Sequence, residues 1–237
     1  MHTPDFNQDG RPPGIGKCVI EEVVCLDREI AAARVRDLLA DDYARALGDH
    51  LHNRIVYEQD IIGDTKQVSR AARSDDMPDS PIVTTAPPTS VAHAALKLLS
   101  DPWWLRQLSR WTGSELQVLR PSTPYRMEAG DFVDPHDDCP APEYRMSVSL
   151  NLTPDWQEFD GGPTVVGLVD RVEEYDHPDW PIPLSRWTLG SEKHTLTPQF
   201  NSALLLPLSP HRAHAVLPVR RGPRYSITTL YGTVAAA

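Results

Sequence analysis

The stretch GDFVDPHDDCPAPEYRMSVSLNLTPDWQEFDGGPTVV, residues 130–166, decides the fold class of this 237-residue chain. Short runs of β-branched and other apolar residues alternate in it with Pro, Gly and Asp, a pattern typical of antiparallel strands joined by turns. The same texture continues on both sides, in LQVLR, SALLLPL, HAVLPV and RYSITTLYG. The sequence therefore predicts a mainly β sandwich or barrel over residues 114–237.

The chain before residue 114 has a different pattern. Residues 1–16 are rich in Pro, Gly and Asp and are expected to form a loose arm, and a β-type run follows at 17–26. From Arg28 to about Leu47 the apolar residues have helical spacing, so a helix is predicted there.

Two more helices are predicted beyond a long polar segment. Residues 58–90 show no sustained period and are predicted to be a loop, either a lid or a surface excursion. Helices should run from a Ser90 cap to Leu99 and from Pro102 to near Gly113. Residues 17–113 are thus interpreted as a mainly helical support for the β region, within one domain of 237 residues.

Composition narrows the class of protein. The 23 Lys and Arg residues against 33 Asp and Glu give a formal charge of -10, which disfavours nucleic acid as a partner. Three cysteines without paired spacing argue against a disulfide framework and fit a reducing cytoplasm. The sequence contains neither a signal-peptide pattern nor a long apolar run, so secretion and membrane insertion are disfavoured. The oligomeric state is not indicated.

A His-x-Asp triplet is the first candidate for chemistry. If residues 136–138 are extended, His136 and Asp138 project to one face while Asp137 points away. With His214 from a distant strand they would form a two-histidine, one-carboxylate triad, which leaves positions on iron(II) open for a co-substrate and oxygen. By the same parity, His211 should face away from His214. The alternative is that the triplet is only a solvated strand end.

An arginine follows the distal histidine at a suitable spacing. The segment HAVLPVRRGPRYSIT is interpreted as a strand, a turn at 221–223 and a returning strand, a hairpin that brings Arg224 near His214. The guanidinium fork fits a carboxylate bidentately, and the Ser226 hydroxyl can reach the same oxygens. These two residues are candidates for binding the distal carboxylate of 2-oxoglutarate.

With these motifs, the chain resembles the prolyl-4-hydroxylase-like branch of the iron(II)/2-oxoglutarate-dependent dioxygenase superfamily. The resemblance spans about Gln117 to Tyr231 and rests on four stretches in the family's order, namely GDFVDPHDD, SLNLTPDWQEFDGGPTVV, FNSALLLPL and HAVLPVRRGPRYSITTLY. It implies a distorted double-stranded β-helix, which is a jelly roll with flanking helices. It also implies iron(II), 2-oxoglutarate and O2 as cofactors and co-substrates, with ascorbate as a stimulant.

The resemblance implies a hydroxylase that releases succinate and CO2. The carboxylate of Asp138 stands where the superfamily's halogenases have a small residue, so halogenation is disfavoured, whereas desaturation or cyclisation stays open. We expect an unactivated C–H bond of a small molecule, such as an amino acid or natural-product intermediate, to be the target. A peptidyl, prolyl-type hydroxylase is the first alternative. A non-catalytic jelly-roll binding domain is the second.

Further residues are weaker candidates. Tyr125 is a candidate for 2-oxoglutarate binding in place of the tyrosine that the family often has near Met127, and its alternative is a core position. Asp134, Arg145 and Asn151 are candidates for substrate binding, with strand-end, surface or core roles as alternatives.

Two other segments of the sequence lie outside these motifs. Gly161 and Gly162 are expected to turn a hairpin without a chemical role. The acidic and aromatic tract 171–187 is expected either to border the substrate pocket or to cover the barrel edge.

Overall fold

The computed structural model describes residues 5–72 and 86–233. The strands are β1 (Val19–Leu26), β2 (Glu29–Arg36), β3 (Tyr57–Ile62), β4 (Lys66–Ala71), β5 (Gln117–Met127), β6 (Phe132–His136), β7 (Tyr144–Asn151), β8 (Thr164–Tyr175), β9 (Leu184–Leu196), β10 (Ser202–Pro207), β11 (Arg212–Val216) and β12 (Arg224–Gly232). The helices are α1 (Asp41–Arg54), α3 (Val91–Leu98), α4 (Pro102–Thr112) and the short 3-10 helix η1 (Glu158–Asp160).

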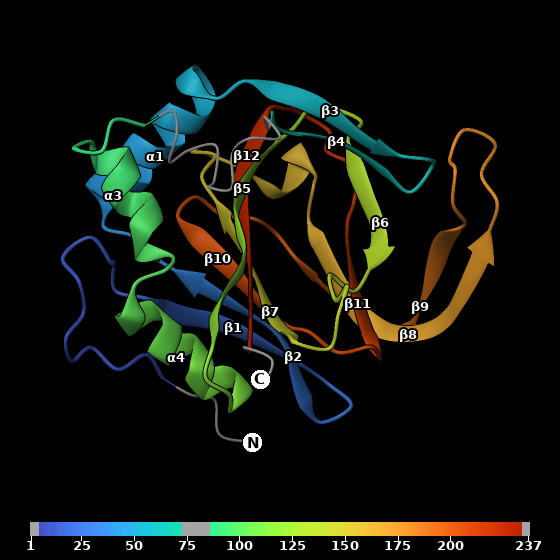
Figure 1. Cartoon of the computed structure of the whole chain (residues 1–237), viewed down its shortest axis with the longest axis horizontal. Coiled ribbons are helices and arrows are strands. Elements are labelled where there is room, and N and C mark those ends of the chain that lie inside the picture. The colour runs from blue at the N-terminus through green and yellow to red at the C-terminus, as the bar shows by residue number, and fades with distance from the viewer. Residues whose placement is uncertain (1–4, 73–85, 234–237) are drawn as a thin grey trace.

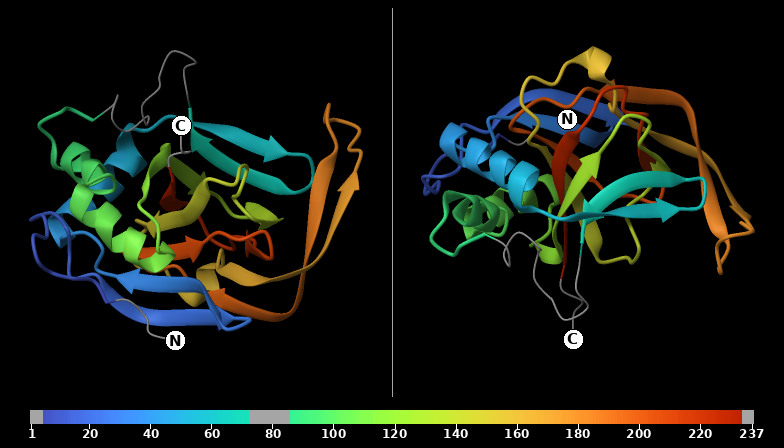
Figure 2. Two further views of the ribbon diagram at one scale, coloured as in Figure 1. Left: turned by 60° about the horizontal axis from the view of Figure 1, so that its bottom comes forward. Right: turned by 90° about the horizontal axis from the view of Figure 1, so that it is seen from above.

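The strands form one continuous antiparallel sheet that curls into a nearly closed barrel. Its order is β1-β2-β10-β7-β12-β5-β4-β6-β11-β8-β9, with β3 paired to β4. Helices α1, α3 and α4 gather on one side of this barrel, whereas the β8–β9 hairpin extends away on the other side (Figure 1). The views in Figure 2 show the same separation. The predicted mainly β jelly roll with flanking helices, a double-stranded β-helix, is confirmed.

The main core lies between the helices and the strands nearest to them. Trp104 is fully buried, stacks on Phe6 with ring centroids 5.8 Å apart, and donates its indole N–H to the Tyr231 hydroxyl at 3.1 Å. That hydroxyl donates to the Leu99 carbonyl at 2.7 Å. The indole and phenol therefore bury a large apolar area while both polar atoms keep partners.

The two later helices form where the sequence predicts them. The Ser90 hydroxyl accepts a hydrogen bond from the His93 amide at the start of α3. Asp101 caps α4 in the same way, and Pro102 occupies its first turn. Gly113 ends α4 at a φ of 68°, the left-handed conformation that glycine adopts without strain. These caps satisfy amide groups that the helices leave free, so local chemistry alone fixes the boundaries.

The helix predicted from Arg28 to Leu47 is wrong over its first part, because residues 29–36 form β2. Asp27 and Arg28 both have positive φ, as a two-residue hairpin turn between β1 and β2 requires. Residues 31–33 are almost completely buried, so β2 carries a continuous apolar run instead of an alternating one. Such a run cannot be told from a helix by periodicity alone. The helix α1 begins only at Asp41.

Two other expectations for the N-terminal half are also corrected. Residues 5–16 are not a loose arm, because Phe6 and Ile15 are 7% and 3% exposed and are part of the core. The predicted loop 58–90 contains most of the β3–β4 hairpin, whose largely polar, partly exposed residues hide any apolar period. The rest of the proposed lid, residues 73–85, lies outside the described residues. The predicted helical support is therefore a mixture of helices and strands.

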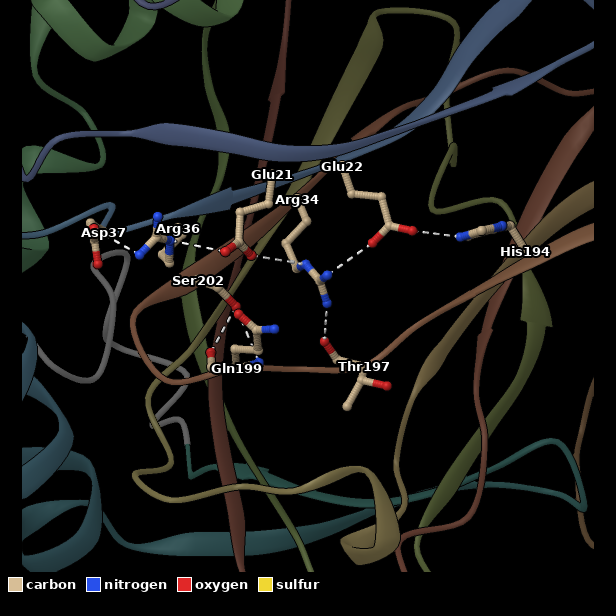
Figure 3. Close-up of polar contacts among 9 residues, drawn as sticks. All are labelled: Glu21, Glu22, Arg34, Arg36, Asp37, His194, Thr197, Gln199 and Ser202. Atoms are coloured by element: carbon tan, nitrogen blue, oxygen red, sulfur yellow. Dashed lines mark hydrogen bonds and ion pairs between the residues drawn. The ribbon is translucent and has the colours of Figure 1, made fainter.

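Polar contacts join the two ends of the strand order. Glu22 on β1 contacts His194 on β9 at 2.7 Å and Arg34 on β2 at 3.0 Å (Figure 3). Arg34 also donates to the Thr197 carbonyl, just beyond β9, at 3.0 Å. Partly exposed ion pairs stabilise a fold only slightly, by about 0–1 kcal/mol each. Their effect here is to hold the first and last strands of the barrel side by side. No helix among the described residues is long and apolar enough to cross a membrane.

We predict that Trp104→Ala lowers the free energy of unfolding by about 3–5 kcal/mol, because it empties a large buried site and leaves the Tyr231 hydroxyl without its donor. Urea denaturation monitored by circular dichroism measures this change. The control Val56→Ala, at a side chain 74% exposed, should stay within about 0.5 kcal/mol of wild type. Similar losses in both variants would contradict this assignment of the core.

Candidate functional site

A cavity of about 320 Å3 opens between the two walls of the barrel. On the wall away from the helices it is lined by residues of β6, β8 and β11, and on the helix-covered wall by residues of β5, β7 and β12 (Figure 1). The β3–β4 and β8–β9 hairpins add further lining residues, including Lys66, Ser185 and Trp187, and β10 adds Leu204 and Leu206. The tract 171–187 therefore borders the pocket, one of its two expected roles.

Two histidines meet on paired strands at this cavity. His136 ends β6 and lies directly opposite His214 on β11, with ring centroids 4.3 Å apart. The Nδ1 atom of His136 lies 2.9 Å from the Asp134 carbonyl. An N–H at Nδ1 that donates to this carbonyl fixes the tautomer and leaves Nε2 free to face a metal.

Asp138 completes the group, although strand parity is not the reason. Strand β6 stops at His136, and Asp138 has a φ of 53°, so the backbone turns into the left-handed region and carries the carboxylate back toward the histidines. Its two oxygens lie 3.4 Å from Nε2 of His136 and of His214. Asp137 instead accepts a hydrogen bond from the Cys139 amide. Asp137 and Asp138 therefore point in different directions, as expected. The cause is the left-handed backbone at Asp138 and not the alternation of side chains along a strand.

The ligand atoms of His136, Asp138 and His214 all lie within 4.8 Å of one another. Such a set of two imidazoles and one carboxylate suits iron(II) and leaves coordination positions open. Ser147 on β7 donates its hydroxyl to Oδ2 of Asp138 at 3.0 Å and so orients the carboxylate. Exposed His211 is not part of the group.

The pKa values of Asp138 and His214 favour the binding of a cation. Burial opposes the charge of Asp138, but its contacts with His136 and His214 outweigh burial and hold its pKa well below the usual range. Burial likewise opposes the charged form of His136, yet the Asp138 carboxylate raises the pKa of that ring. Burial and the charge of His136 lower the pKa of His214. At neutral pH the carboxylate is therefore ionised and the His214 ring is neutral, as metal binding requires.

Arg224 is the second notable group in the cavity. Its side chain is buried, and burial lowers its pKa to about 10, so it stays charged at neutral pH. Nη1 donates to the Gly162 carbonyl at 2.8 Å, and Nε has no hydrogen-bond partner among the described residues. No carboxylate of the described chain pairs with this guanidinium. A buried cation without a counter-ion is costly, and an anionic ligand would remove that cost.

The predicted hairpin between His214 and Arg224 is wrong, although both residues do line one cavity. Strand β11 pairs with β6 and β8, whereas β12 pairs with β5 and β7, so the intervening residues cross from one wall of the barrel to the other. Gly161 and Gly162 belong to a similar crossing between β7 and β8 and not to a hairpin. The Gly162 carbonyl also holds Arg224, a role that the sequence did not indicate.

The weaker candidates divide into two groups. Tyr125, Asp134 and Ser226 line the cavity. Arg145 and Asn151 are absent from the part of the lining that the described chain provides. Arg145 donates to the carbonyls of Pro142, just before β7, and of Tyr144, the first residue of β7, and Asn151 is buried.

Sequence reasoning missed Ser147, although a signal was present. In YRMSVSLN, residues 144–151, the apolar side chains of Met146, Val148 and Leu150 alternate with the polar ones of Ser147, Ser149 and Asn151. The apolar set packs against the helices, whereas Ser147 and Ser149 line the cavity. When a buried strand carries polar side chains on one face, that face is expected to line a cavity inside the barrel.

Comparison with known families decides what this arrangement is. Residues 122–232 match the model of the 2OG-Fe(II) oxygenase superfamily. The chain contains a 2OG-Fe(II) oxygenase domain. Oxygenases of this superfamily use iron(II), 2-oxoglutarate and O2, and the residues present fit that set. The histidine and carboxylate atoms can hold the metal, and Arg224, which has no carboxylate partner in the described chain, suits the distal carboxylate of the co-substrate.

Solved structures share the fold of this oxygenase. An oxidoreductase of the 2OG-Fe(II) oxygenase family from Burkholderia pseudomallei is 22% identical, with 87% of each chain covered and a TM-score of 0.59. A prolyl hydroxylase from Trichoplax adhaerens, in complex with a hypoxia inducible factor oxygen degradation domain peptide fragment, is 16% identical (85% and 83% covered, TM-score 0.56). The epimerase SnoN with Fe3+, alpha ketoglutarate and nogalamycin RO is 15% identical (85% and 78% covered, TM-score 0.57). No curated protein sequence matches the chain.

The oxygenase should lose metal binding when Asp138 is replaced by alanine. Changes that only disturb the orientation of a metal ligand weaken affinity by about 10–100-fold, so loss of a ligand should exceed about 100-fold. Titration of the metal-free protein with Co(II), followed by isothermal titration calorimetry, measures this. Asp137→Ala removes the adjacent carboxylate and should bind Co(II) as wild type does. An equal loss in both variants would mean that Asp138 is not the ligand.

Proposed function

We propose that the enzyme is an iron(II)/2-oxoglutarate-dependent hydroxylase of a small molecule. His136, Asp138 and His214 hold the iron, and Arg224 with Ser226 binds the distal carboxylate of 2-oxoglutarate. The observation that carries this proposal is the buried Arg224, charged and without a carboxylate partner in the described chain, in the same cavity as the three candidate metal ligands.

The side chains of this site would bind and orient the reactants. When bound, iron(II) and 2-oxoglutarate supply O2 activation, with succinate, CO2 and an oxidised substrate as products. Arg224 fixes the far end of the co-substrate, so its keto-acid end is aimed at the metal ligands. The carboxylate of Asp138 fills the third ligand position, which favours hydroxylation over halogenation. Desaturation and cyclisation use the same ligands and would differ only in substrate placement.

The cavity favours a small substrate. Its volume of about 320 Å3 is at the lower end of the range for ligand pockets, and the co-substrate must occupy part of it. The side chains of Val133, Trp187 and Val216 offer apolar walls, and Asp134 adds a carboxylate whose pKa is raised by burial. One structure of similar fold holds a peptide and another a small molecule, so fold does not decide the substrate. A prolyl-type peptide hydroxylase remains the alternative.

We also propose the cytoplasm as the compartment. Cys18, Cys25 and Cys139 are all free thiols, which is usual where proteins are kept reduced.

Replacement of Arg224 by leucine should weaken 2-oxoglutarate binding by at least about 30-fold, because the buried cation is the main partner of the distal carboxylate. The iron(II)-loaded protein, kept anaerobic, is titrated with 2-oxoglutarate while its visible charge-transfer absorption is recorded. The control Arg221→Leu changes a guanidinium that is 71% exposed and should leave the titration unchanged. Absence of any absorption band in the wild-type protein would contradict the proposed function.

Substrate-stimulated succinate formation would test the substrate class. The wild-type enzyme, with iron(II), 2-oxoglutarate and O2, is assayed against free amino acids, nucleosides, small natural-product scaffolds and proline-containing peptides. We expect a small molecule to raise succinate formation above the uncoupled rate and the peptides to leave it unchanged, since the cavity is small. Stimulation by the peptides alone would support the prolyl-type alternative instead.

A further inference from the structure

Asn151 is a buried amide that the proposed chemistry does not yet use. The side chain is 3% exposed, and neither Nδ2 nor Oδ1 has a hydrogen-bond partner among the described residues. Buried polar atoms are almost always paired, so an amide that lacks both partners needs an explanation. A ligand or an ordered water that reaches the amide is the simplest one.

The position of Asn151 indicates which ligand that is. On β7 it alternates with Leu150 and shares the face of Ser147 and Ser149, which line the cavity. It lies directly opposite Ser226 on β12. Side chains paired in this way have Cβ atoms roughly 4.5–5.5 Å apart, and Arg224 is the next residue of β12 on the same face. The amide is therefore a neighbour of both groups proposed to bind the distal carboxylate.

The other polar neighbours of Asn151 are already engaged. Ser202, its pair on β10, donates to the Gln199 carbonyl at 2.7 Å and accepts from the Gln199 amide at 3.2 Å (Figure 3). Thr153, two residues beyond the end of β7, accepts from the Tyr225 amide at 2.6 Å. No hydrogen bond of the Ser226 hydroxyl is found in the described part of the chain. Within the described chain, the buried atoms without a partner at this end of the barrel are thus the amide N and O of Asn151 and the Nε of Arg224.

These groups match a carboxylate in number and kind. An ionised carboxylate offers about four acceptor sites. The Arg224 fork can fill two of them, the Ser226 hydroxyl a third and the Asn151 amide N–H a fourth. We propose that Asn151 completes the binding site for the distal carboxylate and thereby sets the enzyme's preference for a dicarboxylic 2-oxo acid. This inference rests on the proposed function.

The test compares two 2-oxo acids of equal chain length that differ in the distal carboxylate. The anaerobic iron(II)-loaded full-length protein is titrated with 2-oxoglutarate and with 2-oxopentanoate, and the visible absorption gives each Kd. Asn151→Ala should weaken 2-oxoglutarate binding by roughly 10- to 100-fold, because a hydrogen bond to a charged group is lost, and should leave 2-oxopentanoate binding unchanged. Equal weakening of both acids, or of neither, would overturn the inference.

Thermal unfolding supplies a second readout with matched variants. Asn151→Leu has a similar volume and removes an unpaired buried amide, so the unliganded protein should melt at a higher temperature while the stabilisation by 2-oxoglutarate shrinks. The buried amide of Asn201 is instead bonded to the Leu39 backbone at 3.0 and 2.8 Å. Asn201→Gly, which suits the φ of 54° there, should lower the melting temperature and keep the preference for 2-oxoglutarate.

The two hypotheses fail in different ways. If wild-type protein with iron(II) binds neither acid, the proposed function is wrong. If wild type prefers 2-oxoglutarate and both Asn151 variants keep that preference, the proposed function stands and Asn151 is only structural. A lower melting temperature of unliganded Asn151→Leu would point to the same structural role and count against the inference.

Discussion

The pairing of β7 with β12 is the constraint on which the rest of this structure depends. Asn151 opposite Ser226 and Ser149 opposite Thr228 set a register in which both strands turn one face to the helices and one to the barrel interior. A shift of one residue would place Leu150 and Ile227 inside the cavity and expose the polar set to the helices. The apolar face therefore determines where the polar face lies. Burial against the helices, which stabilises the fold, thus positions the side chains of the site.

That arrangement leaves unfavourable groups inside the barrel. The guanidinium of Arg224 is buried, and among the described residues it contacts a carbonyl and no carboxylate. Asn151 adds an amide with no partner in the described chain. Both groups lower the stability of the unliganded barrel. A bound anion would pair with the guanidinium and accept a hydrogen bond from the Asn151 amide N–H. A site that is destabilised when empty and stabilised when filled is the expected outcome where binding has been favoured over stability.

The sequence indicates the candidate site residues of this chain better than it indicates how the strands are connected and paired. Residue types and their order predict His136, Asp138, His214 and Arg224 as candidates. The structure brings ligand atoms of the first three within 4.8 Å of one another and places the fourth in the same cavity. Strand parity and a hairpin do not bring these residues together, because the left-handed Asp138 and the crossing between β11 and β12 depend on tertiary pairing that no local pattern encodes. The helix predicted over β2 failed for the same reason. A strand buried on both faces loses its alternation, and only its neighbours reveal it.

The two ends of the cavity differ in how firmly the fold holds them. The candidate metal ligands come from short strands and a turn, and Asp138 contacts one serine hydroxyl and two imidazoles. Arg224 lies instead within the barrel wall that the helices cover, and the Gly162 carbonyl fixes its fork. A 2-oxo acid fastened first at the rigid end would present its keto-acid group to the more adaptable metal ligands. In the proposed function, the buried arginine would therefore set the orientation in which such an acid meets the triad.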